Sequence, residues 1–247
     1  MRKLKVLGVE LKDYSVREAM RRITLYLNNG ACNTVDFVSH DALLKASGDE
    51  DLKSNIETMD LVIPVSSDIL QAGSIFSRSR EREIESNLFF KGFLRKLEKE
   101  RRSVFLISST SQKLESLSNT LGSFFGPLNV VSGAASEETV GGGDFLVNEI
   151  NSCLPEVVIL NLESPLAEQF IVENSMKLNC QLIVVVRDVS LRVSSDGNVK
   201  RGGLGGFLAR RFFRNAAINY EKENNPPEDT GEYRDEDPPE KIINLGN

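Results

Sequence analysis

The sequence predicts an α/β protein built on a mostly parallel β-sheet with helices on both faces. Short apolar runs rich in β-branched residues alternate with segments of ordinary helical length, and this alternation is typical of parallel sheets. The segment PEVVILNLESPLAEQF at 155–170 shows the unit most clearly, with a buried strand at 156–160 followed by a turn and a helix. We expect Ser164 to cap that helix and Pro165 to occupy its first position. Ligands of open α/β sheets bind at such carboxyl ends of strands.

The first hundred residues begin this alternation. The run KVLGVEL at 5–11 predicts a bent strand or small hairpin around Gly8, and Ser15 with Glu18 forms a capping box for an amphipathic helix that closes at Gly30. The elements expected next are a strand at 34–39, helices at 41–46 and 51–58, a strand at 60–63, a helix capped by Ser67 or Asp68, and a loop followed by an apolar-faced helix within the polar stretch 78–101.

The remaining elements continue the same order. They are a strand at 103–107, a helix from Ser109 to about Phe124, a strand at 128–131, a loop that begins at Gly133, a helix at 144–151, the strand and helix of 155–170, a strand at 181–186 and a helix at 207–220. We therefore divide the chain into an α/β domain at 1–200, a basic amphipathic helix at 201–220 and an acidic tail at 221–247 that we expect to be disordered.

The charge is distributed unevenly along the chain. The sequence has 30 basic and 36 acidic residues, and residues 221–247 hold three of the bases and nine of the acids. Residues 1–220 therefore carry 27 charges of each sign, so the body has no basic field of the kind that nucleic acid requires. We expect no nucleic-acid partner.

Targeting and cysteine content favour a cytoplasmic protein. No apolar run approaches the ~18–20 residues of a spanning helix, and the first residues lack the apolar core and cleavage site of a signal peptide. The three cysteines, Cys32, Cys153 and Cys180, have no metal-type spacing, and we expect them to be reduced structural thiols. With His40 as the single histidine, the sequence predicts no metal site.

Four titratable residues are candidates for chemistry, and each has an ordinary alternative. His40 follows the 34–39 strand and is either a proton-transfer group or a neutral, hydrogen-bonded histidine. Asp36 lies inside that strand and needs a partner or a raised pKa if it points into the core. Asp68 is either an acid/base carboxylate or a helix cap. Glu168 either contacts a polar ligand or only complements the helix dipole.

A local basic cluster precedes the tail. It consists of Lys200, Arg201, Arg210, Arg211 and Arg214, interleaved with Phe207, Phe212 and Phe213. A basic helix with aromatic side chains suits an anionic membrane surface or a lipid-borne phosphate, so peripheral contact with the inner face of the plasma membrane is one expectation. A helix that packs its phenylalanines and solvates its arginines is the alternative.

The order of motifs resembles the WecG/TagA/CpsF-type bacterial glycosyltransferases over about residues 4–201. The resemblance rests on KVLGVELKDYSVREAM, FVSHDALLKA, DLVIP at 60–64, VFLIS at 104–108, NVVSGAAS at 129–136, INSCLPEVVILNLESPLAEQF at 150–170 and GNVKRGG. It implies a Rossmann-like α/β fold. It also implies metal-independent transfer of a hexosamine-type sugar from a UDP-sugar to a polyprenyl-diphosphate-linked acceptor in cell-envelope polysaccharide synthesis.

The same comparison of motifs implies substrate-binding positions at Ser39, Ser66, Ser108, Gly133, Ser164, Pro165, Glu168 and Arg201. Several of the family's residues are replaced. The proposed general-base Asp of the family is Val65 here, and valine cannot take a proton. The Asn of its Thr-x-Asn motif is His40, its glycines after the VFLI strand are Ser108 and Ser109, and its Arg-Ala-Pro signature begins at Arg201.

Three functions remain open at this point. The first is an active transferase in which Asp68, Asp36 or His40 replaces the missing base. The second is a pseudoenzyme that binds a protein partner in envelope assembly, and the third is a binding module that holds another phosphorylated ligand with the basic cluster. The distinguishing feature is whether a carboxylate reaches the turn at 64–66. A homo-oligomer is compatible with each function.

Overall fold

The computed structural model describes residues 2–125, 127–138, 143–187 and 204–224. Its main sheet has six strands in the order β4-β3-β8-β7-β5-β6, and every neighbouring pair is parallel. The strands are β3 (Asn33–Val38), β4 (Leu61–Pro64), β5 (Ser103–Ser108), β6 (Asn129–Ala135), β7 (Val157–Asn161) and β8 (Leu182–Val185). This confirms the mostly parallel, Rossmann-like α/β architecture expected from the sequence.

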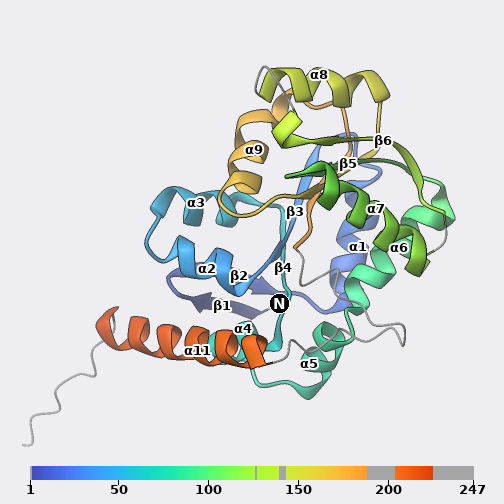
Figure 1. Cartoon of the computed structure of the whole chain (residues 1–247). Helices are drawn as coiled ribbons and strands as arrows, with labels where there is room; N and C mark the ends of the chain where they lie inside the picture. Colours follow the sequence, from blue (N-terminus) through green and yellow to red (C-terminus); the bar gives the residue numbers. More distant parts are fainter. Residues whose placement is uncertain (1, 126, 139–142, 188–203, 225–247) are drawn as a thin grey trace, which may run out of the picture.

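Helices cover the sheet on both faces (Figure 1). One face carries α1 (Val16–Tyr26), α6 (Leu88–Glu100) and α7 (Ser111–Phe125), and the other carries α2 (His40–Ala46), α3 (Glu50–Thr58), α8 (Gly143–Cys153) and α9 (Leu166–Asn174). Two separate apolar clusters fill these layers. Strands such as β7 are buried along their whole length because both of their faces meet helices.

The N-terminal segment forms the hairpin that its sequence predicts. Strands β1 (Arg2–Val6) and β2 (Val9–Asp13) pair antiparallel, and the turn between them places Gly8 at φ +83°. The capping box is also confirmed, since the Ser15 side chain accepts from the Glu18 backbone amide while the Glu18 carboxylate accepts from that of Ser15. Helix α1 ends at Tyr26, a turn before Gly30.

Two stretches that we expected to be loops are regular. Helix α5 (Arg78–Glu85) forms in the polar segment, although none of its residues is buried. Its Arg80 pairs with Asp13 at 2.8 Å and also with Glu83, so ion pairs replace the apolar stripe that would have revealed the helix. Gly133 belongs to β6 opposite Leu106, where a Cβ would lie 3.0 Å from the Leu106 carbonyl oxygen.

Two predicted helix caps are displaced by one or two residues. Ser66, rather than Ser67 or Asp68, caps α4 (Ser67–Ala72), because its side chain accepts from the Asp68 amide. Thr110, rather than Ser109, accepts from the Lys113 amide at the start of α7. Adjacent hydroxyl and carboxyl side chains compete for the same amides, so sequence alone does not choose between them.

Helix α11 (Leu204–Asn224) crosses the body of the protein beside α4 and the β1–β2 hairpin (Figure 1). Phe213 and Ala217 of this helix are buried in the core cluster that includes β1 and β2. A Cβ on Gly8 would approach within 2.3 Å of the Tyr220 hydroxyl oxygen, so the ring covers the hairpin turn closely. Residues 221–224, which we predicted to begin the acidic tail, continue α11, and the rest of the predicted tail at 225–247 lies outside the described residues.

Candidate functional site

The carboxyl ends of β3 and β4 place several predicted residues together. The Val65 amide donates to the Val38 carbonyl at 3.1 Å, so the turns that follow these two strands lie side by side. The Ser39 side chain accepts from the Ala42 amide and caps α2, which starts at His40. Both α2 and α4 therefore begin at this edge of the sheet.

The Asp68 side chain reaches the turn at 64–66, which contains Val65. Its Oδ2 accepts a hydrogen bond from Ser66 Oγ at 3.0 Å, and the residue is only 8% exposed. The same oxygen lies 3.4 Å from Arg210 Nε of α11. The structure thus brings together a carboxylate, a hydroxyl and a guanidinium beside the substituted Val65.

His40 is held between this carboxylate and α11. Its ring lies against Phe213 with centroids 4.3 Å apart, and its buried Nε2 has no hydrogen-bond partner among the described residues. Burial lowers the pKa of His40 below its ordinary value, Asp68 opposes this and Arg210 reinforces it. Burial therefore disfavours the imidazolium and favours the neutral imidazole.

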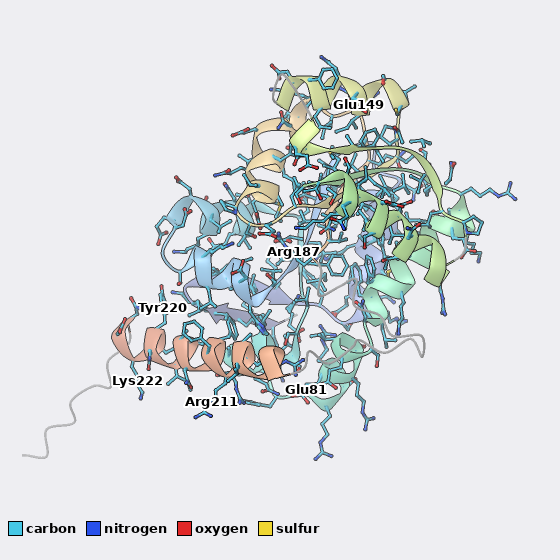
Figure 2. The ribbon with its side chains drawn as sticks, viewed as in Figure 1. Glu81, Glu149, Arg187, Arg211, Tyr220 and Lys222 are labelled. Atoms are coloured by element: carbon cyan, nitrogen blue, oxygen red, sulfur yellow. The ribbon has the colours of Figure 1, made fainter. Side chains whose placement is uncertain are left out.

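A second group, the buried triad, joins Asp36 of β3, Glu168 of α9 and Arg187 after β8. Arg187 Nη2 lies 3.0 Å from Asp36 Oδ1 and 2.5 Å from Glu168 Oε1. Arg187 Nη1 also donates to the Leu162 carbonyl at 3.0 Å. Arg187, which is labelled in Figure 2, is buried and connects β3, the start of α9 and the turn after β7 through these contacts.

The triad has one positive group for two carboxyl groups. Burial raises the pKa of Asp36 to about 6, with Arg187 opposing the shift and Glu168 adding to it. Asp36 Oδ2 and Glu168 Oε2 are buried and lack partners within the described part of the chain. Both conditions that the sequence set for Asp36, a partner and a raised pKa, are met.

The turn between β7 and α9 differs from its prediction. The Ser164–Pro165 peptide bond is cis, and Pro165 takes the N-cap position without a side-chain hydrogen bond. Ser164 does not cap the helix, because its hydroxyl donates to Glu168 Oε1 at 2.7 Å. Glu168 is fully buried and ion-paired with Arg187, so its carboxylate does more than complement the helix dipole, and its contact with a polar ligand stays a prediction. Lys45 of α2 donates to the Ser164 carbonyl at 3.0 Å.

A pocket opens on the other side of the β4 turn. It lies between α1, α5 and the ends of β3 and β4. Its empty volume, counted together with the open solvent at its mouth, is about 440 Å³. Its lining includes Val65, Pro64, Phe37, Tyr14, Arg80 and Glu83, and is mostly apolar. Asp68, His40 and Asp36 do not line it. Val65 therefore faces a largely apolar space, whereas His40 and Asp68 contact α11 and Asp36 lies in the buried triad.

The other predicted residues are dispersed. Ser108 is buried and donates to the Asn161 carbonyl at 3.5 Å, which ties β5 to β7. Arg211 and Arg214 are exposed on α11, and Arg211 points away from the body (Figure 2). Arg201 lies outside the described residues.

Sequence reasoning missed two cations. Arg187 directly follows the run Leu182–Val186, and a buried acid at Asp36 requires a buried partner, so an arginine at the end of a predicted strand was the available signal. Lys45 lies in a short helix, and nothing in the sequence around it indicates its contact with the Ser164 turn. That contact depends on the strand order, which the sequence does not give. Within the described ranges, no three His, Cys, Asp or Glu side chains are grouped to hold a metal ion, and no helix is long and apolar enough to cross a membrane.

Comparison with known protein families assigns the chain to one of them. No match was found among curated proteins. The model of the glycosyl transferase WecG/TagA/CpsF family, in contrast, matches residues 4–201, which include His40, Asp68 and the buried triad and end before α11. Because this match covers well over half of the sequence, the chain belongs to the WecG/TagA/CpsF family of glycosyl transferases.

Proposed function

We propose that this protein transfers a hexosamine-type sugar from a UDP-sugar to a polyprenyl-diphosphate-linked acceptor in cell-envelope polysaccharide synthesis. Family membership supports the reaction class. The observation that supports catalytic activity is the position of Asp68. Its carboxylate contacts Ser66 in the turn where Val65 replaces the general base implied by the resemblance. Asp36 is a weaker candidate because Arg187 binds its carboxylate in the core.

In this proposal Asp68 removes the proton from the acceptor hydroxyl as that oxygen attacks the sugar's anomeric carbon. The bond to UDP breaks, and the diphosphate carries away the negative charge. Arg210, which lies 3.4 Å from Asp68, can exchange this contact for a phosphate oxygen and so free the carboxylate. His40 supplies a neutral imidazole beside both groups.

The outer face of α11 is proposed to contact the membrane surface. Leu208, Phe212 and Ile218 are exposed by 59%, 67% and 50%, and Arg211 and Lys222 accompany them on the side directed away from the body (Figure 2). Exposed apolar side chains with adjacent cations favour an anionic lipid surface.

A pseudoenzyme is the second candidate, and one observation favours it. Phe213 and Arg210 of α11 already cover His40 and Asp68, so the groups that would do chemistry are engaged within the protein. Such a molecule would act by binding a partner, with α11 as a fixed part of its surface.

Titration calorimetry with UDP, followed by transfer assays with UDP-hexosamines, tests the proposal. Micromolar UDP binding is expected, together with a ~10²–10⁴-fold loss of transfer rate in Asp68→Asn and a smaller loss in His40→Ala. Asp41→Asn is the matched control, because Asp41 is an exposed carboxylate at the start of the same helix as His40. Absence of binding at millimolar UDP would reject the transferase in favour of the pseudoenzyme.

A further inference from the structure

Two of the three cysteines lie side by side at the edge of the sheet opposite the strand ends described above. Cys32 directly precedes β3, and Cys180 lies two residues before β8. These strands are parallel neighbours, and the Asn33 amide donates to the Gln181 carbonyl at 3.0 Å. The two sulfur atoms are 3.6 Å apart although the residues are 148 positions apart in sequence.

We propose that Cys32 and Cys180 are a modification site, a dithiol that peroxides convert into a disulfide joining β3 to β8. A disulfide requires its sulfurs at about 2.05 Å, which lies one small side-chain movement from the observed contact between two paired strands. Both residues are partly exposed, so a small oxidant can reach them. This proposal departs from the sequence-based expectation that the cysteines are reduced structural thiols.

The chemistry begins at Cys32. Its hydrogen bond with Cys180 lowers the pKa of the Cys32 thiol, whereas that bond and burial raise the pKa of Cys180. Hydrogen peroxide oxidises the Cys32 sulfur to a sulfenic acid and is reduced to water. The Cys180 sulfur then attacks the sulfenic sulfur: the S–S bond forms, the S–O bond breaks, and the oxygen leaves as a second water with the Cys180 proton.

The crosslink would act on the strands that carry the buried triad. Asp36 lies on β3, and Arg187 follows β8 by two residues. A disulfide between these strands closes a long loop, and in the chain-entropy model long loops gain the most stability from closure. The oxidised protein is therefore expected to unfold at a higher temperature than the reduced one.

The test treats the full chain with a slight excess of hydrogen peroxide, blocks the remaining thiols with iodoacetamide and measures intact mass and peptide linkage. Wild type and the control Cys153→Ser are expected to lose two thiols, gain a Cys32–Cys180 peptide and show a Tm rise that dithiothreitol reverses. Cys32→Ser and Cys180→Ser should gain neither the linkage nor the Tm rise. Three unreacted thiols, a linkage through Cys153, or a crosslink between two chains would overturn the proposal.

Discussion

Phe213 of α11 and His40 of α2 lie in ring contact, with centroids 4.3 Å apart and planes inclined by 35°. The contact joins the C-terminal helix to the start of the helix that follows β3. It therefore makes α11 part of the candidate site, although the family match ends at residue 201.

Truncation of Phe213 is expected to cost much more stability than truncation of its neighbour. Phe213 is fully buried and Phe212 is 67% exposed. Phe213→Ala should lower the free energy of unfolding by about 3–5 kcal/mol, because it leaves a cavity under α11, and Phe212→Ala by less than about 0.5 kcal/mol. Urea unfolding of both variants measures the difference. Equal effects would show that α11 does not dock as described.

The charge state of His40 should follow its two neighbours. Since His40 is the single histidine of the chain, its NMR resonance is unambiguous. Arg210→Gln is expected to raise the His40 pKa and Asp68→Asn to lower it, because Arg210 disfavours the imidazolium and Asp68 favours it. Arg214→Gln is the control for loss of a helix charge. A pKa that none of the three changes would contradict the geometry.

The fold was predictable because its strands are apolar throughout and its helices follow the expected periods. The candidate site was less predictable from the sequence than the fold. Asp68 and His40 could be placed at one edge of the sheet from sequence, since both follow neighbouring strands. Arg187 could not be assigned to Asp36, because that pairing requires β8 to lie beside β3. Helix α5 was not predicted because ion pairs and a single partly buried apolar side chain, Ile84, hold it in place of an apolar stripe.

Loss of Arg187 is expected to destabilise the protein strongly. Arg187→Leu leaves the buried carboxyl groups of Asp36 and Glu168 without their cation, which typically costs about 3–5 kcal/mol. Lys177→Gln removes an ion pair with Asp144 whose two side chains are 52% and 81% exposed, and should cost less than about 1 kcal/mol. Denaturant unfolding distinguishes the two. A small effect at Arg187 would mean that solvent reaches the triad.

Asp36 should make stability depend on pH in a defined direction. Its pKa is raised from 3.8 to about 6 in the folded protein. The folded state therefore binds the proton more tightly than the unfolded chain. The protonation of Asp36 therefore adds roughly 1–4 kcal/mol to the free energy of unfolding. This addition is fully present below about pH 4 and is lost as pH rises through about 6. In Asp36→Asn the contribution should be absent. Urea unfolding of wild type and Asp36→Asn across this pH range measures the contribution. If the free energies of unfolding of the two proteins change in parallel with pH, the raised pKa of Asp36 is refuted.

The exposed face of α11 should determine binding to anionic vesicles. The double change Arg211→Gln with Phe212→Ser removes a cation and an apolar side chain from that face. It should reduce flotation with phosphatidylglycerol vesicles at low salt by several-fold. Arg95→Gln removes an exposed charge from α6 and should leave flotation unchanged. Equal flotation of all three proteins would remove the membrane proposal.

The strand order has a consequence for how the protein is made. Strand β8 is the last strand of the sheet in sequence, yet it lies between β3 and β7 and joins the pair β4–β3 to the trio β7–β5–β6. During synthesis these two groups of strands cannot join into one sheet until residues 182–185 have left the ribosome. Until then each group exposes an unpaired apolar edge strand. We therefore expect slow folding and a need for chaperones at high expression, because long-range parallel pairing delays burial and open edges aggregate.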